Sequence, residues 1–404
     1  MSRRACRIML VLLLLVTAAA FSSDDDSADQ LLAQAKSVYS QQGPKEALPK
    51  YERALAAYRQ SGNRLGEAIT IGLMGNCYKR LGDYPKALEL LNSSLSVKRE
   101  LHERLEEGKT LSNLGLVYWE QADYPRAIQV FNESIAIAHE LANVQLEASA
   151  LNNLSLVYDE EGDYRRSLEQ YKKALELHRS IKYEPGESDT LGNIGGVFLS
   201  LGRFSEAASY YRQALEISRR LGLKPSETQD LGNIAQCQFG QGKTKESLQS
   251  FDEAITIAKS AGMAKEEADW YRGKASVLLS VGQFDAALRN YDSSETSYSK
   301  AGLKREYAEA LTDSGAAFLT VGDRAGAERQ IRRAVSISKQ IGYERGVVLN
   351  QLALAEVLLR SGDQPQTKQM AESALAGATK LGESDAVVQG LLLLGRISRE
   401  RRQL

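Results

Sequence analysis

Glycine recurs at a constant step of 40 residues through most of this chain, at Gly82, Gly162, Gly202, Gly242, Gly282, Gly322 and Gly362. The one departure within the series is position 122, where the sequence has Ala122. A period of about 20 to 50 residues is typical of repeat arrays, whose units bury their apolar faces by stacking on neighbours. We therefore expect one elongated domain instead of the two or three that 404 residues would suggest. Such an array argues against most enzyme folds.

Each period contains two runs of apolar residues spaced three and four apart, which is the spacing of amphipathic helices. In the period 111–141, the first run begins at Leu111 and the second includes Phe131. Between such runs, Gly82 ends one helix and Asp83 can cap the next. A second glycine series ends the second helix of the period: Gly62, Gly222, Gly262, Gly302, Gly342 and Gly382. Each period therefore predicts a helical hairpin.

Large and small side chains also recur at equivalent positions of the repeat. One position of the second helix holds aromatic residues, namely Tyr51, Phe131, Tyr171, Tyr211, Phe251 and Tyr291. Another holds small residues, namely Ala87, Ala127, Ser167, Ala207, Ser247, Ala287 and Ala327. An aromatic series at this spacing predicts a helix–helix core and not a ligand site.

The order and spacing of these residues resemble the tetratricopeptide repeat. The run that carries the resemblance is Leu111, Leu114, Gly115, Tyr118, Asp123, Tyr124, Ala127, Phe131 and Ser134. The step of 40 exceeds the usual length of about 34, as in kinesin light chains, Pins-type adaptors and bacterial extracytoplasmic members. HEAT and armadillo repeats are similar in length but lack the Gly-Asp-Tyr turn. The resemblance implies an all-α fold, a right-handed α-solenoid of stacked helical hairpins whose first helices line the concave face.

The repeat predicts nine hairpins over residues 28–382, followed by a helix within 383–404 that matches the first half of a tenth unit. This last helix is either a cap with a polar outer face or a truncated repeat.

The N-terminus differs from the repeats. Three arginines within the first seven residues precede an apolar run at 8–16 and the small residues Ala18 to Ala20. This order predicts a secretory signal over residues 1–20, cleaved after Ala20, and an acidic leader at 21–27. We therefore expect an extracytoplasmic protein, periplasmic or secreted, with membrane contact only through the signal if it stays uncleaved.

Composition and motifs give little support for catalysis. Lys and Arg total 51 and Asp and Glu 52, so no overall basic character predicts a nucleic-acid partner. Cys77 and Cys237 lie four steps apart at one core position and are expected to be buried and unbridged, whereas Cys6 belongs to the signal. The three histidines are expected on or near exposed positions late in second helices. Carboxylates such as Glu107 are expected at helix starts or ends, where a solvated or dipole-stabilising role suffices. No catalytic residue, metal site or cofactor is predicted. Three sequons fall within predicted helices and are read as chance matches: Asn92, Asn132 and Asn153.

One series on the first helices is polar: Asn113, Asn153, Asn193 and Asn233. An amide both donates and accepts hydrogen bonds, which suits the backbone of an extended peptide. The family resemblance implies main-chain contacts to a ligand at this position. Further contacts are expected from Lys109, Trp119, Asn152 and Gln236. In the alternative interpretation, each asparagine bonds within its own hairpin or the adjacent turn.

Two functions remain open at this level. The chain is either a non-catalytic scaffold that binds a peptide or protein segment, or the sensor part of a larger bacterial system with a caspase-like protease of the CHAT type. A cytoplasmic receptor for signalling peptides would require the signal sequence to be misread. A clamp for chaperone tails is disfavoured because Gly72 stands where a lysine is expected.

Overall fold

The structure is a computed structural model and describes residues 27–400. The predicted signal at 1–20 and most of the acidic leader at 21–27 lie outside the described residues. The chain divides into two compact units, residues 1–183 and 184–404. Each unit is described by itself.

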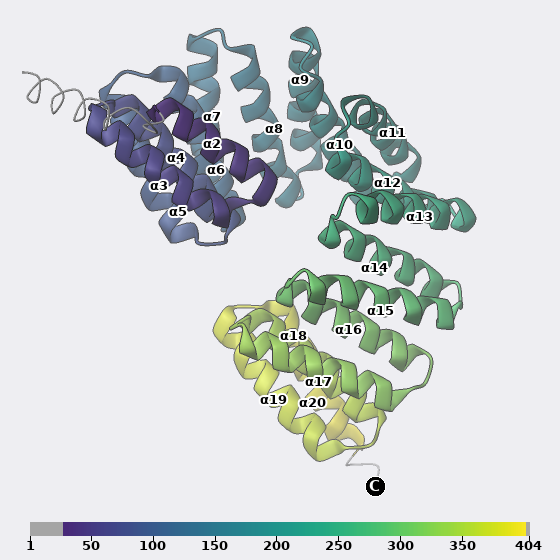
Figure 1. Ribbon diagram of the computed structural model, residues 1–404. Coiled ribbons are helices and arrows are strands. Elements are labelled where there is room, and N and C mark those ends of the chain that lie inside the picture. Colours follow the sequence, from purple (N-terminus) through teal and green to yellow (C-terminus); the bar gives the residue numbers. More distant parts are fainter. Residues whose placement is uncertain (1–26, 401–404) are drawn as a thin grey trace, which may run out of the picture. The chain divides into compact units, whose positions relative to one another are not determined.

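Both units consist of helices joined by short turns (Figure 1). The helices of the first unit are α2 (Ala28–Gln42), α3 (Pro44–Ser61), α4 (Arg64–Arg80), α5 (Tyr84–Glu100), α6 (Arg104–Glu120), α7 (Tyr124–Glu140), α8 (Val144–Glu160) and α9 (Tyr164–Ser180). Those of the second unit are α10 (Glu184–Ser200), α11 (Phe204–Leu221), α12 (Lys224–Gly240), α13 (Thr244–Ser260), α14 (Ala264–Ser280), α15 (Phe284–Lys300), α16 (Lys304–Thr320), α17 (Arg324–Gln340), α18 (Glu344–Arg360), α19 (Gln364–Leu381) and α20 (Ser384–Glu400).

Consecutive helices pair as hairpins, from α2 with α3 to α18 with α19, and α20 follows alone. Within a unit, each second helix packs on its own first helix and on the next one, and successive first helices such as α6 and α8 touch. The predicted all-α fold of stacked hairpins is therefore confirmed. Over the described residues, no helix is long and apolar enough to cross a membrane.

The turns explain the glycine series. Gly82 lies at φ 78°, a left-handed conformation that glycine adopts without a Cβ penalty. Ala122 takes the equivalent left-handed conformation at φ 57°, so the turn geometry persists where the glycine is lost.

Small residues on the first helix accept a large side chain from the second. A Cβ added to Gly115 would lie 2.5 Å from the ring of Phe131, which is 0% exposed. Cys77 and Cys237 are free and buried at their predicted core positions, and burial raises the pKa of both thiols to about 11.

The prediction of exposed histidines is wrong at His178 and confirmed at His102 and His139. His178 is only 2% exposed, because it faces the packed side of α9 and its ring meets that of Tyr183. His102 lies beyond α5, in the turn, with φ 57°. His139 is exposed near the end of α7, as expected.

Candidate functional site

A polar pocket of about 500 Å³ lies in the first unit between the first helices α6 and α8. Lys109, Asn113 and Asn153 line it, as three of the predicted ligand-binding residues. The remaining walls come from Leu105, Ser112, Asn143, Gln145, Leu146 and Ser149. Lys109 and Asn113 lie on α6, and Asn153 lies on α8, the first helix of the following hairpin. Hairpin stacking therefore brings together Asn113 and Asn153, which are 40 positions apart.

The amides of Asn113 and Asn153 are unpaired. Among residues 27–400, neither side chain has a hydrogen-bond partner within the chain. Both side chains are half-buried at the pocket and retain their donors and acceptors for a ligand. The alternative interpretation holds instead for Asn233, whose Oδ1 accepts from Gln229 Nε2 of the same helix at 3.4 Å.

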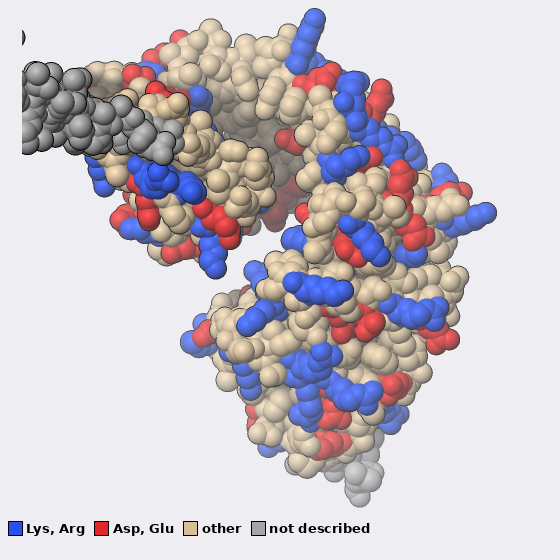
Figure 2. Space-filling view, in the orientation of Figure 1, with Lys and Arg blue, Asp and Glu red and all other residues tan. Residues whose placement is uncertain are grey.

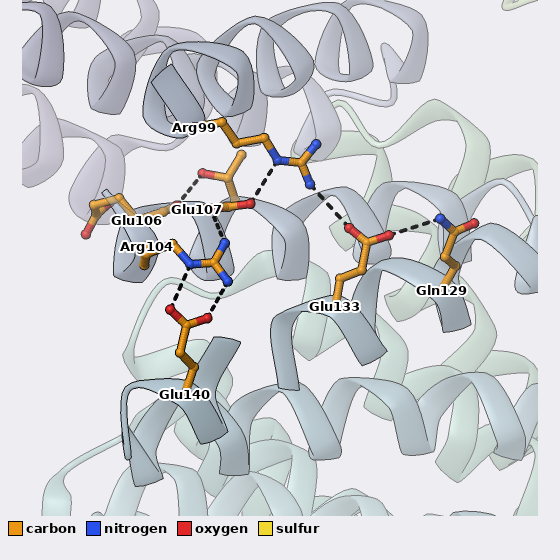
Figure 3. Close-up of polar contacts among 8 residues, drawn as sticks. Arg99, Arg104, Glu106, Glu107, Gln129, Glu133 and Glu140 are labelled. Atoms are coloured by element: carbon orange, nitrogen blue, oxygen red, sulfur yellow. Dashed lines mark hydrogen bonds and ion pairs between the residues drawn. The ribbon is translucent and has the colours of Figure 1, made fainter. Parts of the chain in front are cut away.

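An ion-pair network fixes the start of α6 (Figure 3). Glu107 accepts from Arg99 Nε of α5 at 2.8 Å and from Arg104 Nη1 at 2.6 Å. Arg99 also reaches Glu133 of α7, and Arg104 reaches Glu140 at the end of α7. The Glu107 side chain is only 5% exposed, which rules out the solvated role, whereas its place in the first turn of α6 agrees with the dipole-stabilising one. Because this network joins three helices, it holds α6 and its pocket residues in register.

The positive charge at the pocket is that of Lys109 on α6. Lys109 Nζ lies 2.7 Å from Glu106 Oε1, one turn earlier on α6. The lysine side chain is 52% exposed, so this i,i+3 pair is weak and a ligand carboxylate could compete for it.

A larger cavity of about 1000 Å³ lies in the second unit along α12, α14 and α16. Its floor includes Trp270, whose ring occupies the space that a Cβ at Gly232 would need, 2.3 Å away. Two charged residues that line this cavity form an ion pair between helices. Arg272 Nε of α14 lies 2.5 Å from Asp313 Oδ2 of α16. Gln236 lines this cavity as an exposed residue.

The predicted set is thus divided. Asn113 and Asn153 belong to the first unit, and Asn193 and Asn233 to the second. Each pair is described within its own unit.

Two predicted contacts in the first unit lie outside the pocket. Trp119 is half-buried and packs against the core around Phe131, with its indole nitrogen buried and unpaired. Asn152 is half-buried and has a partner of its own. Sequence reasoning missed Ser112 and Ser149, although Ser149 lies one 40-residue step after Lys109 and could have been found from that register.

The second unit has a buried carboxyl group on the first helix α12. Asp230 of α12 is 5% exposed; burial raises the pKa of its carboxyl to about 7, and the charge of Asp189 adds to the rise. Ser218 Oγ donates to it at 3.1 Å.

On the visible face of each unit, Lys and Arg are interleaved with Asp and Glu (Figure 2). In the described part of the chain, no cluster of three His, Cys, Asp or Glu side chains could hold a metal ion.

Comparison with models of known protein families identifies the repeat. Residues 28–100, 106–180 and 186–260 match the tetratricopeptide repeat. Because these residues make up more than half of the chain, the protein belongs to the tetratricopeptide repeat family. No curated protein sequence matches it.

Several solved structures have a similar fold. A signal transduction ATPase with numerous domains and a tetratricopeptide repeat sensor, from Pyrococcus horikoshii, matches 92% of this chain and 55% of its own, at 14% identity and a TM-score of 0.61. The apo quorum sensor NprR from B. thuringiensis matches 83% and 94%, at 15% identity and a TM-score of 0.54. A Rap protein complexed with competence and sporulation factor matches 83% and 98%, at 13% identity and a TM-score of 0.52. At such identities the likeness concerns the fold alone.

Proposed function

We propose that this protein is a non-catalytic scaffold that captures an extended peptide or protein segment on the first helices of its first unit. The observation that carries the proposal is the pair of unpartnered amides, Asn113 and Asn153, on the wall of one pocket. An extended peptide offers a backbone N–H and C=O at every residue, and an asparagine can bond both at once.

The pocket also suits such a ligand in size and polarity. About 500 Å³ holds a few residues of a chain and not a whole domain. Ser112 and Ser149 add hydroxyl groups, and Lys109 favours an acidic group in the ligand. A Rap protein of similar fold is described in complex with competence and sporulation factor, which is compatible with ligand capture by such an array.

The test replaces Asn113 and Asn153 together by alanine. Peptides that bind the unaltered full chain are first selected from a displayed random library, and their affinities are then measured by calorimetry. If each asparagine gives one or two net hydrogen bonds of about 1 kcal/mol, affinity falls at least about thirtyfold.

The matched control is Asn132→Ala, on the exposed face of α7. It should leave both affinity and Tm unchanged. Unchanged binding by the Asn113/Asn153 double variant, together with a marked fall in its Tm, would show that these amides serve the fold and not a ligand.

The proposed location is extracytoplasmic, based on the signal-like N-terminus. Mass spectrometry of the protein isolated from its native host tests this directly. A mature chain that begins at Phe21 is expected, and a chain that retains residues 1–20 in the cytoplasm would contradict the location.

A further inference from the structure

The cavity of about 1000 Å³ along α12, α14 and α16 has no part in the proposed peptide capture. All of its lining residues belong to the second unit. Sites for small molecules usually measure about 300 to 1000 Å³ and have mostly apolar and aromatic walls. The large apolar residues that line this cavity are Leu199, Phe204, Phe239, Phe251, Trp270 and Leu279. Both its size and its walls therefore suit a small molecule.

Small residues on the first helices leave this space open. At the repeat position that Leu116 holds in α6, the cavity has Ser276 on α14 and Ala316 on α16. At the position of Asn113, the wall on α14 has Gly273. The second unit therefore has space where the first unit has side chains. It also lacks, on α14, the amide on which peptide capture is proposed to depend.

Tyr291 of α15 brings a hydroxyl group to the cavity. The residue lines the cavity and is only 4% exposed. Among residues 27–400, its hydroxyl has no hydrogen-bond partner. The equivalent hydroxyl of Tyr171 is sealed off by packing, whereas that of Tyr291 is not. Burial raises the pKa of Tyr291 to about 12, so its hydroxyl keeps its proton and can both donate and accept at neutral pH.

The charged residues that line the cavity neutralise one another in pairs. Arg272 is paired with Asp313, and Lys265 Nζ lies 2.9 Å from Asp269 Oδ2. The Arg272 side chain is 34% exposed, so water only partly screens its ion pair. A charged ligand would have to displace one member of such a pair and leave the other without its partner, which is costly away from water. The cavity therefore favours an uncharged ligand.

We propose that this cavity binds an uncharged aromatic small molecule that carries a hydrogen-bonding group. Its ring would pack against the aromatic walls, where offset and edge-to-face contacts are favourable. Its polar group would bond the hydroxyl of Tyr291, whose burial leaves few other partners. An extended peptide fits less well, because Gly273 offers no amide and Asp313, at the same repeat position, is held by Arg272. The inference does not depend on the pocket of the first unit.

The test titrates the full chain with N-phenyl-1-naphthylamine, an uncharged dye whose emission rises in apolar surroundings and whose N–H can donate to a hydroxyl. We expect saturable binding at one dye per chain. The matched control probe is 1-anilinonaphthalene-8-sulfonate, which has the same ring system with an added negative charge. It should bind at least about tenfold more weakly.

The variant Ser276→Leu fills the cavity and should weaken binding of the dye by at least about tenfold. It is expected to fold normally, because Leu116 and Leu156 hold the same position in the first unit. The matched control is Ser336→Leu on the exposed face of α17, which should leave the affinity for the dye unchanged.

The variant Tyr291→Phe tests the hydroxyl alone. Phe131 and Phe251 occupy the equivalent position, so phenylalanine fits the packing there. Loss of one hydrogen bond should weaken binding of the dye about fivefold. In a chain with Trp119→Phe, Trp270 is the one remaining tryptophan, and its emission should fall by energy transfer as the dye binds beside it.

Absence of saturable binding would overturn the proposal, and so would equal affinities for the two dyes. Binding of the uncharged dye that Ser276→Leu leaves intact would place that dye elsewhere and overturn it too. Unchanged affinity in Tyr291→Phe would refute the role of the hydroxyl. If peptides selected on the full chain lose at least about tenfold in affinity in Ser276→Leu, the occupant is a peptide and the proposal is wrong.

Discussion

Substituting leucine at two equivalent glycines tests the packing scheme, because the structure predicts opposite outcomes. At Gly115, a Cβ alone would lie 2.5 Å from the Phe131 ring, and that ring is 0% exposed within a cluster that includes Leu154. Overpacking costs about 1 to 3 kcal/mol, and more when several carbons are added. Helix propensity returns about 0.8 kcal/mol when leucine replaces glycine. We therefore expect Gly115→Leu to lose about 2 kcal/mol or more.

At Gly395 the added side chain meets open space. Only the propensity gain applies, so Gly395→Leu should be neutral or stabilise the protein by up to about 1 kcal/mol.

Urea denaturation followed by tryptophan fluorescence separates the two units. With Trp270→Phe, Trp119 reports on the first unit; with Trp119→Phe, Trp270 reports on the second. This separation matters because repeat arrays often unfold in more than one step. Equal losses in the two variants, or a Gly115→Leu variant as stable as its parent, would refute the proposed equivalence of the two positions.

Two further predictions concern charged groups. Asp230 keeps its proton to about pH 7 in the folded protein, whereas an aspartate in the unfolded chain loses its proton near about pH 4. Between these two pH values the native state binds more protons than the unfolded state, so the free energy of unfolding falls as the pH rises from about 4 to about 7. Asp230→Asn should remove that fall and raise Tm at about pH 8 more than at about pH 4; parallel Tm profiles of variant and parent across pH would contradict the assignment. Glu107→Ala leaves Arg99 and Arg104 without their buried partner and should cost about 1 to 3 kcal/mol in urea denaturation. The control Glu89→Ala removes one side of the exposed Lys86–Glu89 pair on α5 and should cost less than about 0.5 kcal/mol. Equal losses in the two variants would show that the Glu107 network adds nothing beyond a surface pair.

The sequence alone determined the repeat and the all-α fold of stacked helical hairpins. These features depend on interactions within a few residues: apolar spacing of three and four, a cap such as Asp83, and a turn residue such as Gly82. A strict 40-residue period then repeats one local solution, so equivalent residues such as Cys77 and Cys237 take equivalent environments. The loss of glycine at Ala122 did not disturb the turn, whose backbone bonds from Ala122 N to Trp119 O and from Asp123 N to Tyr118 O match those at Gly82 and Asp83.

Only the tertiary structure decided which polar groups are free. Asn113 and Asn233 occupy the same position of the repeat, yet the first is unpaired and the second bonds within its own helix. The difference depends on side chains that vary from one hairpin to the next. Trp119 and Glu107 look solvent-facing in the sequence but are partly or wholly covered, because residues of the neighbouring helix pack over them. The helical period places a side chain on a face of its helix, whereas packing against adjacent hairpins determines whether that side chain stays available to a ligand.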